Sequence, residues 1–180
     1  MDRLFVGLSL PEVVVDALTI MQHGIDGARW RPVENFHITL AFIGEVDRNG
    51  FEATIDALSL IDVPVFEIDL SGAGYFGDTT PRAIWAGVKR SEQLKHLQAK
   101  VANALRQSGF VLERRKYVPH VTLAYLSGVP QSVTEQYCAE HGLFQCGPFP
   151  VESFHLYSSQ LGSAASHYEI EASYSLSFSR

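Results

Sequence analysis

The sequence lacks the features that mark secreted and membrane-spanning proteins. It holds only two cysteines in 180 residues, Cys138 and Cys146, and they form no Cys-x-x-Cys pattern. Two free thiols are typical of a reducing compartment. No apolar run approaches the roughly 18 residues that a membrane span needs. The start, Met1–Gly7, is too short and too acidic for a signal peptide, so we expect a cytoplasmic protein without a membrane segment.

An excess of positive charge is also absent. The chain has 14 Lys and Arg against 20 Asp and Glu, which gives a net charge of −6. This balance argues against broad, sequence-independent binding of long nucleic acid, which depends on a large basic surface. It leaves room for a small anionic ligand in a local basic pocket. The hydrophobic content of 46% and charged content of 19% are those of an ordinary globular protein, with ample length for a core.

Linkers, low-complexity tracts and nucleotide-binding loops are missing too. The glycine-rich segment Ser71–Gly77 lacks the Gly-Lys-Ser/Thr ending of a phosphate-binding loop. Its glycines are more typical of a bulge or a turn in a strand. No composition shift divides the chain, which favours one domain or two small lobes over separate domains.

The sequence does contain two near-identical stretches. His37–Gly44 reads His-Ile-Thr-Leu-Ala-Phe-Ile-Gly, and His120–Ser127 reads His-Val-Thr-Leu-Ala-Tyr-Leu-Ser. A match to His-x-Thr-Leu arises by chance about once in 10⁴ positions, so two copies in one chain are not an accident. Both stretches are rich in β-branched, aromatic and aliphatic residues, which predicts strands.

Alternation along these strands predicts one apolar face and one face with chemistry. Alternate side chains of a strand share a face, so His37 and Thr39 should point the same way. The predicted polar face carries His37, Thr39, Ala41 and Ile43 in the first copy and His120, Thr122, Ala124 and Leu126 in the second, while Phe42 and Tyr125 fall on the apolar face. We expect the small alanine to leave room for a ligand. Two imidazoles, each beside a hydroxyl, suit a reaction that needs an acid and a base.

Periodicity and breaker residues predict the other elements. Strands are expected over residues 4–10, 65–70, 83–88, 150–158 and 168–178, and helices over 11–24, 49–60, 91–108 and 131–141. Residues 78–82 should form a hairpin turn, Ser91 should be an N-cap, and the apolar stripe of the helix that follows should be core. Strands and helices mix without regular alternation, which favours antiparallel α+β. The duplicated motif predicts two lobes that bring both histidines to one cleft.

Two basic segments are candidates for binding phosphate. Arg29–Arg31 places two arginines around Trp30, a combination that can hold a phosphate and a base. The alternative is a surface loop with one packed indole. Arg114–Lys116 lies directly upstream of His120, where it could steer an anion, although a basic run is more often solvated surface.

At these residues the sequence resembles the two-histidine phosphoesterases, and within them the RNA 2′,3′-cyclic phosphodiesterases, historically named 2′-5′ RNA ligases. The paired His-x-Thr-x motifs are the specific part of the resemblance, which runs from Arg3-Leu4-Phe5 to Leu156-Tyr-Ser158. It implies an α+β fold in which two pseudo-twofold-related lobes of antiparallel sheet, with outer helices, flank an active-site cleft. It also implies a single two-lobed domain over residues 1–180.

The resemblance implies hydrolysis of RNA 2′,3′-cyclic phosphodiester ends to 2′-phosphomonoesters, with no metal and no cofactor. His37 would be the proton donor and His120 the proton acceptor. The predicted substrate-binding residues are Thr39, Thr122, Arg114, Arg115, Lys116, Trp30 and Phe76. Many relatives carry arginine where this chain has Tyr125, and Arg114–Lys116 is expected to compensate. The expected partners are RNA with 2′,3′-cyclic phosphate ends or small cyclic nucleotides, and the expected state is a monomer.

Three other functions fit parts of the pattern. A metal site is disfavoured because two histidines are too few and no carboxylate or cysteine sits at a ligand spacing beside either. A non-catalytic RNA-end or nucleotide-binding module would tolerate arginine or lysine in place of the histidines, so the retained His-x-Thr pairs favour turnover. Joining of RNA ends in a 2′-5′ linkage uses the same site in the reverse type of transfer, and abundant water favours hydrolysis.

Overall fold

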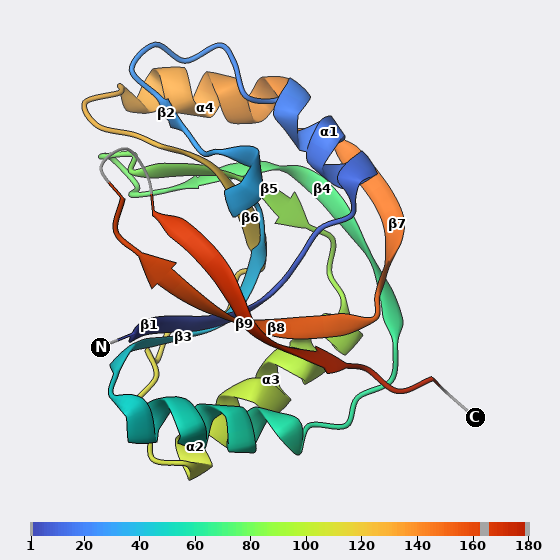
Figure 1. Cartoon of the computed structure of the whole chain (residues 1–180). Coiled ribbons are helices and arrows are strands. Elements are labelled where there is room, and N and C mark those ends of the chain that lie inside the picture. Colours follow the sequence, from blue (N-terminus) through green and yellow to red (C-terminus); the bar gives the residue numbers. More distant parts are fainter. Residues whose placement is uncertain (1, 163–165, 179–180) are drawn as a thin grey trace.

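Two antiparallel sheets form the centre of the molecule (Figure 1). The computed structural model describes residues 2–162 and 166–178. The first sheet has the order β3-β1-β8-β9, with β1 (Asp2–Leu8), β3 (Ile38–Val46), β8 (Ser153–Gln160) and β9 (His167–Ser175). The second sheet has the order β2-β6-β5-β4-β7, with β2 (Arg29–Trp30), β4 (Phe66–Phe76), β5 (Ala83–Val88), β6 (His120–Tyr125) and β7 (Gln145–Val151).

Each sheet has its own pair of helices. The helices are α1 (Glu12–Ile20), α2 (Arg48–Ser59), α3 (Glu92–Gln107) and α4 (Gln131–Glu140). Helices α2 and α3 contact each other and strand β3, whereas α1 contacts β7 and α4 contacts β4, so the two pairs lie at opposite ends of Figure 1. The predicted α+β fold of two antiparallel lobes with outer helices is confirmed.

Two helices, α1 and α3, each pack against the lobe opposite to the strand that precedes them. Helix α1 follows β1 of the first sheet but contacts the second, and α3 follows β5 of the second sheet but contacts the first. Strands β3 and β6, which carry the two motifs, are themselves in contact. The crossing connections therefore place the two motifs side by side where the lobes meet.

A local sequence signal marks the start of α3. The Ser91 hydroxyl accepts the Leu94 N–H at 3.1 Å, which confirms the predicted N-cap of α3. The predicted apolar stripe of α3 is core, with Leu97, Val101 and Leu105 fully buried. Within the described residues, no helix is long and apolar enough to cross a membrane.

Two segments differ from the prediction. Helix α1 ends at Ile20, before the predicted end at residue 24. The strand predicted over 150–158 is two strands, β7 and β8. Strand β7 contains Gly147, Pro148 and Pro150, which argue against a strand in a sheet centre, but β7 lies at the sheet edge where missing N–H donors are tolerated. Between the strands predicted over 150–158 and 168–178, residues 163–165 lie outside the described residues.

Each motif strand contains a β-bulge at the same position. Gly7 pairs with Thr39 and Val6 with Ala41, which leaves Leu40 unpaired as the extra residue. In the second sheet the pairing skips Leu123 in the same way. A bulge adds one residue to one strand, so the inside–outside alternation reverses beyond it.

The bulges overturn part of the predicted face assignment. Ala41 and Ala124 are buried in the core, with exposures of 8% and 0%. Phe42 and Tyr125 are instead 56% and 37% exposed, and both line the cleft between the sheets. The prediction that the alanine leaves room for the ligand is therefore wrong in the second motif, where Ala124 lines neither cavity, whereas Ala41 still lines the larger cavity beside Phe42.

The glycine-rich segment is a bulged part of β4, as predicted, and it accommodates a tryptophan. Strand β4 pairs with β5 on either side of an irregularity between Leu70 and Ala73. A Cβ atom at Gly74 would lie 2.3 Å from the Trp85 ring, so only glycine lets this ring lie flat on the strand. The Trp85 ring in turn lies 5.9 Å from the His120 ring.

We expect Gly74→Ala to lower the free energy of unfolding by about 1–3 kcal/mol, because the new methyl group must push the Trp85 ring aside. Urea unfolding of the variant and of the wild type measures this loss. In a Trp85→Leu background the same alanine should cost much less, since the ring it meets is gone. An equal cost in both backgrounds would show that the contact with Trp85 is not the cause.

Candidate active site

The two histidines are held in the same way. His37 directly precedes β3, and its Nδ1 lies 2.8 Å from the carbonyl oxygen of Asn35. His120 begins β6, and its Nδ1 lies 2.6 Å from the carbonyl oxygen of Val118. A carbonyl can only accept, so Nδ1 carries the proton in both rings and Nε2 is the atom left for chemistry. In the neutral form, His37 Nε2 accepts a hydrogen bond from the Thr39 hydroxyl at 2.9 Å.

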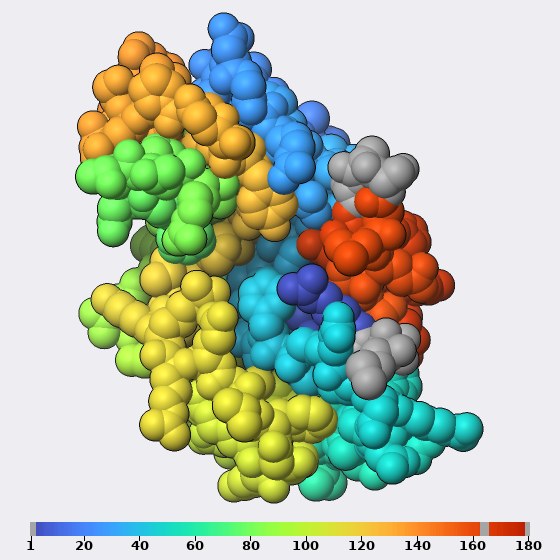
Figure 2. Space-filling view, turned by 90° about the vertical axis from the view of Figure 1, so that its left-hand side faces the viewer, coloured from blue at the N-terminus to red at the C-terminus, as the bar shows by residue number. Residues whose placement is uncertain are grey.

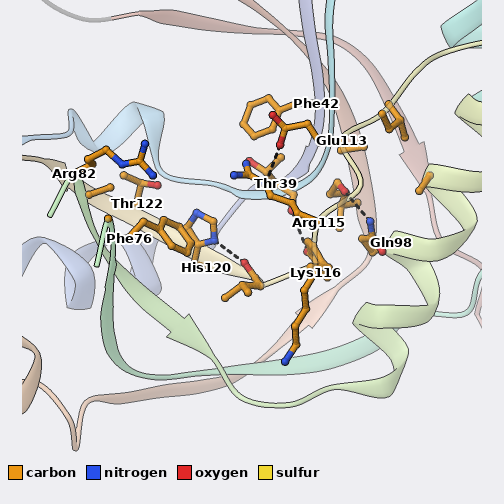
Figure 3. Close-up of a pocket in the computed structure, with 18 of the residues that line it drawn as sticks. Thr39, Phe42, Phe76, Arg82, Gln98, Glu113, Arg115, Lys116, His120 and Thr122 are labelled. Atoms are coloured by element: carbon orange, nitrogen blue, oxygen red, sulfur yellow. Dashed lines mark hydrogen bonds and ion pairs between the residues drawn. The ribbon is translucent and has the colours of Figure 1, made fainter. Parts of the chain in front are cut away.

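Aromatic rings surround both imidazoles. The ring centroid of His37 lies 4.7 Å from that of Phe5 and 5.3 Å from that of Tyr168, the latter edge to face. The ring centroid of His120 lies 4.9 Å from that of Phe76, also edge to face. Figure 3 shows the two side chains next to each other. Phe76 thus lies beside the histidine of the second motif, and its role in binding substrate remains a prediction.

This burial sets the protonation of the pair. Desolvation lowers the pKa of His37 to about 4, against the opposing effect of its hydrogen bond to the Asn35 carbonyl. The positive charges of His120 and Arg31 lower the pKa of His37 further. Desolvation also lowers the pKa of His120, and the charge of Arg115 adds to it. Both imidazoles are therefore mainly neutral at pH 7 in the ligand-free cleft.

Two adjoining cavities, of about 640 and 540 Å³, meet at the motifs. Both are lined by Thr39, His120 and Thr122, so the two hydroxyls and the second imidazole face the space they share. The larger cavity extends past Phe76, and the smaller one contains His37. In Figure 2 the surface is hollowed where the cyan residues of β3 lie between the yellow segment before β6 and the red β9.

The cleft is basic although the chain is acidic. The cationic side chains in the two linings are Arg3, Arg31, Arg82, Arg106, Arg115 and Lys116. Glu113 is the one carboxylate among the described residues that line either cavity, and its Oε2 lies 2.8 Å from Arg115 Nε. The net negative charge of the chain did not exclude a local basic pocket, and the cleft is such a pocket. Its positive charge suits an anionic ligand.

Most of the predicted site residues come together, and two do not. His37, Thr39, Phe76, Arg115, Lys116, His120 and Thr122 line the cleft. Arg114 is exposed and lies outside both linings. Trp30 lies 6.2 Å from the Tyr137 ring, away from the cleft, because alternation in β2 turns it to the side opposite Arg29 and Arg31. Trp30 is packed against the core and lines neither cavity, so its role as a ligand contact stays a prediction.

Sequence reasoning did not single out several residues of the cleft. Phe5 and Tyr168, which pack on His37, come from opposite ends of the chain and meet only through the strand order of the first sheet. The Tyr117 hydroxyl donates to the Thr39 carbonyl at 3.0 Å and so ties the segment before β6 to β3. Arg82 enters the cleft from the turn before β5. No local pattern in the sequence could have identified these contacts.

Metal ligands do not cluster in the site. Across residues 2–162 and 166–178, no group of three or more His, Cys, Asp or Glu side chains is placed to hold a metal ion. The groups available for chemistry at the junction of the cavities are two imidazoles, two hydroxyls and several cations.

With this geometry established, comparison with known proteins identifies the family. The model of the 2′-5′ RNA ligase superfamily matches residues 11–162, and the chain belongs to that superfamily. It is similar to the RNA 2′,3′-cyclic phosphodiesterase of Thermotoga maritima, with 30% identity over 93% of this chain and 92% of that protein. A match to the same-named protein of Geobacillus stearothermophilus has 38% identity over 53% of this chain but only 31% of that protein's length.

Solved structures share the fold. A crystal structure of E. coli LigT complexed with 3′-AMP has a TM-score of 0.78 at 23% identity, over 97% of this chain and 98% of that one. The crystal structure of TT0787 of Thermus thermophilus has a TM-score of 0.75 at 26% identity, over 99% of this chain and 100% of that one. The two-lobed α+β architecture is therefore shared over the full length of these proteins.

Proposed function

We propose that this protein hydrolyses RNA 2′,3′-cyclic phosphodiester ends to 2′-phosphomonoesters by acid–base catalysis that needs no metal. The observation that carries the proposal is the pair of imidazoles, one from each lobe, each with Nδ1 fixed by a carbonyl and Nε2 left for a shared basic cleft. The relatives in the same superfamily that are named RNA 2′,3′-cyclic phosphodiesterases support it.

The roles of the histidines follow from the chemistry of the reaction. Water must lose a proton as it attacks phosphorus, and the departing 3′ oxygen must gain one. We assign the base to His120 and the acid to His37, as the resemblance implies. A base and an acid from two facing lobes can act on opposite sides of phosphorus, which an in-line displacement requires.

The threonine hydroxyls stabilise the phosphate as charge develops on it. Thr39 and Thr122 line both cavities, where each can donate a hydrogen bond to a non-bridging oxygen. In the ligand-free cleft the Thr39 hydroxyl donates to His37 Nε2 instead. When Nε2 takes up a proton it no longer accepts that bond, and the hydroxyl is released to the phosphate.

In this mechanism, binding of the substrate favours the protonated form of His37. With its pKa near 4, His37 is neutral at pH 7 and cannot donate a proton to a leaving oxygen. An anionic phosphate beside the ring favours the imidazolium form and offsets the repulsion from Arg31. Binding of the cyclic phosphate therefore charges His37 at the place where the proton is needed.

We infer that residues 1–180 form one two-lobed domain and that a monomer is active. Both histidines and both threonines of one chain line the smaller cavity, which supports this inference. The partners are RNA with 2′,3′-cyclic phosphate ends or small cyclic nucleotides. The two free cysteines fit the expected cytoplasmic location.

A 2′,3′-cyclic-phosphate-ended oligonucleotide tests the function. We expect conversion to the 2′-phosphate end at the same rate with and without EDTA, with the product resolved from the 3′-phosphate isomer. An unchanged oligonucleotide would contradict the proposed hydrolysis and favour a non-catalytic RNA-end-binding module. A joined product in the presence of a 5′-hydroxyl acceptor would indicate end joining, and inhibition by EDTA would contradict the metal-free mechanism.

We expect Thr39→Val and Thr122→Val each to lower kcat/KM about 10- to 100-fold, because each removes one donor to the developing negative charge. Their unfolding free energies should change by less than about 1 kcal/mol, since valine nearly matches threonine in shape. Thr39→Ser and Thr122→Ser keep the hydroxyl and serve as controls that should retain most activity. Large losses of stability at unchanged kcat/KM would make these threonines structural residues instead.

A further inference from the structure

Arg31 is a cleft cation whose backbone is firmly tied to the second lobe. Its N–H donates to the Leu123 carbonyl at 2.8 Å, directly after the pairing of β2 with β6. Its own carbonyl accepts the Gln22 amide at 2.8 Å, and that amide also donates to the Leu123 carbonyl at 3.1 Å. These hydrogen bonds fix the backbone of Arg31 beside β6, the strand that begins with His120.

The side chain of Arg31 reaches across to the first lobe. Its guanidinium carbon lies 5.0 Å from the Tyr125 ring centroid and 5.9 Å from that of Tyr168 on β9. One guanidinium nitrogen also donates to the Tyr168 hydroxyl at 3.3 Å. Tyr168 packs edge to face on His37 at 5.3 Å, so the charge is held close to the first imidazole by two neutral rings.

Among the described residues, no carboxylate forms an ion pair with this charge. The ion pairs there join Arg48, Arg90 and Arg115 to glutamates, and Arg31 takes part in none of them. Arg31 is half-buried and lines the same cavity as His37. A half-buried cation without a counter-ion costs free energy, which an anion in the cavity would recover.

We propose that Arg31 binds an anionic oxygen of the scissile phosphate and that Tyr125 and Tyr168 hold its guanidinium in position. This inference rests on the proposed function and adds a phosphate-binding residue to it. The planar guanidinium presents two parallel N–H groups to a phosphate, a geometry that an ammonium group cannot reproduce. In this proposal Arg31 takes the role that was expected of Arg114–Lys116, because Arg31 is the arginine that both lies against the Tyr125 ring and lines the cavity with His37.

Phosphate binding by variants tests the proposal without relying on turnover. We expect Arg31→Met to weaken the binding of inorganic phosphate, measured by calorimetry, about 10- to 100-fold. The phosphate affinity of Arg31→Lys should lie between those of the wild type and Arg31→Met, since lysine keeps the charge and lacks the paired N–H donors. Arg29→Met is the matched control, because Arg29 is exposed, lies 5.8 Å from the same Tyr125 ring and is outside both cavity linings. Equal affinities in wild type and Arg31→Met, or no phosphate binding by the wild type, would overturn the proposal.

Kinetics with two substrates identify the phosphate concerned. A cyclic mononucleotide and a cyclic-phosphate-ended dinucleotide should lose kcat/KM equally in Arg31→Met, because both contain the scissile phosphate. A loss confined to the dinucleotide would assign Arg31 to the internucleotide phosphate and contradict the proposal. Arg31 lowers the pKa of His37, so loss of the arginine charge should also shift the pH profile of kcat/KM toward higher pH, which a purely structural role would not do. If the wild type hydrolyses neither substrate, the proposed function fails, and the phosphate titration still decides the role of Arg31.

Discussion

Replacing either motif histidine by alanine is expected to lower kcat on a cyclic-phosphate-ended oligonucleotide by about 10²–10⁴-fold, the usual contribution of a general acid or base. His37→Ala removes the proton that the 3′ oxygen needs, and His120→Ala removes the acceptor for the proton of water. The double variant should be little worse than the worse single one, because the two groups act in one step. Single-turnover rates at saturating substrate measure the loss.

Folding must be separated from catalysis in these variants. His23→Gln is a suitable control, because His23 is exposed and lines neither cavity, so its kcat should match that of the wild type. Circular dichroism melts should show that the alanine variants stay folded at the assay temperature. A folded His37→Ala or His120→Ala protein with near-wild-type kcat would refute the two-histidine mechanism.

The sequence was sufficient to place the chemistry because the informative pattern is local. His37 and Thr39 are two residues apart on one strand, and period two alone brings both to one face. The bulge one residue later was not predictable, because the segment from Leu40 to Ile43 contains no glycine or proline to signal it. Its position depends on the pairing with β1, where Val6 and Gly7 skip Leu40. Contacts between distant strands thus decided that Phe42 is exposed in the cleft while Ala41, in the wall of the larger cavity, is mostly buried.

Trp30 is a second residue whose position depends on tertiary contacts and could not be predicted from the local sequence. A two-residue strand is too short for any alternation to be read from the sequence, yet its pairing with β6 fixes which side chains share a face. Of the two arginines around Trp30, only Arg31 lines a cavity, and the Trp30 ring lies near that of Tyr137. Likewise, only the strand order brings Tyr168 from the end of the chain to His37.

The pH dependence of kcat/KM should be bell-shaped, with both limbs below the ordinary histidine pKa of about 6.5. Activity needs one neutral and one protonated imidazole in the same molecule. Burial favours the neutral form of each ring, which lowers the pKa of His37 to about 4 and lowers that of His120 as well. As pH rises the acid loses its proton, and as pH falls the base becomes protonated. The two limbs are macroscopic values of a coupled pair, so the wild-type profile assigns neither to one residue.

Comparison of kcat with kcat/KM over the same pH series tests the role of the substrate in charging His37. The bound phosphate favours imidazolium, so the alkaline limb of kcat should lie at higher pH than that of kcat/KM, which reports the free enzyme. The His37→Ala variant should lose the alkaline limb if His37 is the acid, and His120→Ala the acidic limb if His120 is the base. Coincident alkaline limbs in kcat and kcat/KM would contradict proton uptake on binding.

Acid unfolding must be excluded as the cause of the acidic limb, since the same pKa shift affects stability. Above about pH 6.5 His37 is neutral in both the folded and the unfolded chain and contributes nothing to the pH dependence. Between about pH 6.5 and about 4 the unfolded chain binds a proton that folded His37 does not, so stability falls as pH falls through this range. Circular dichroism at each pH should show a folded protein across the limb. A profile that rises monotonically with pH and collapses with EDTA would indicate metal-bound hydroxide and refute the acid–base pair.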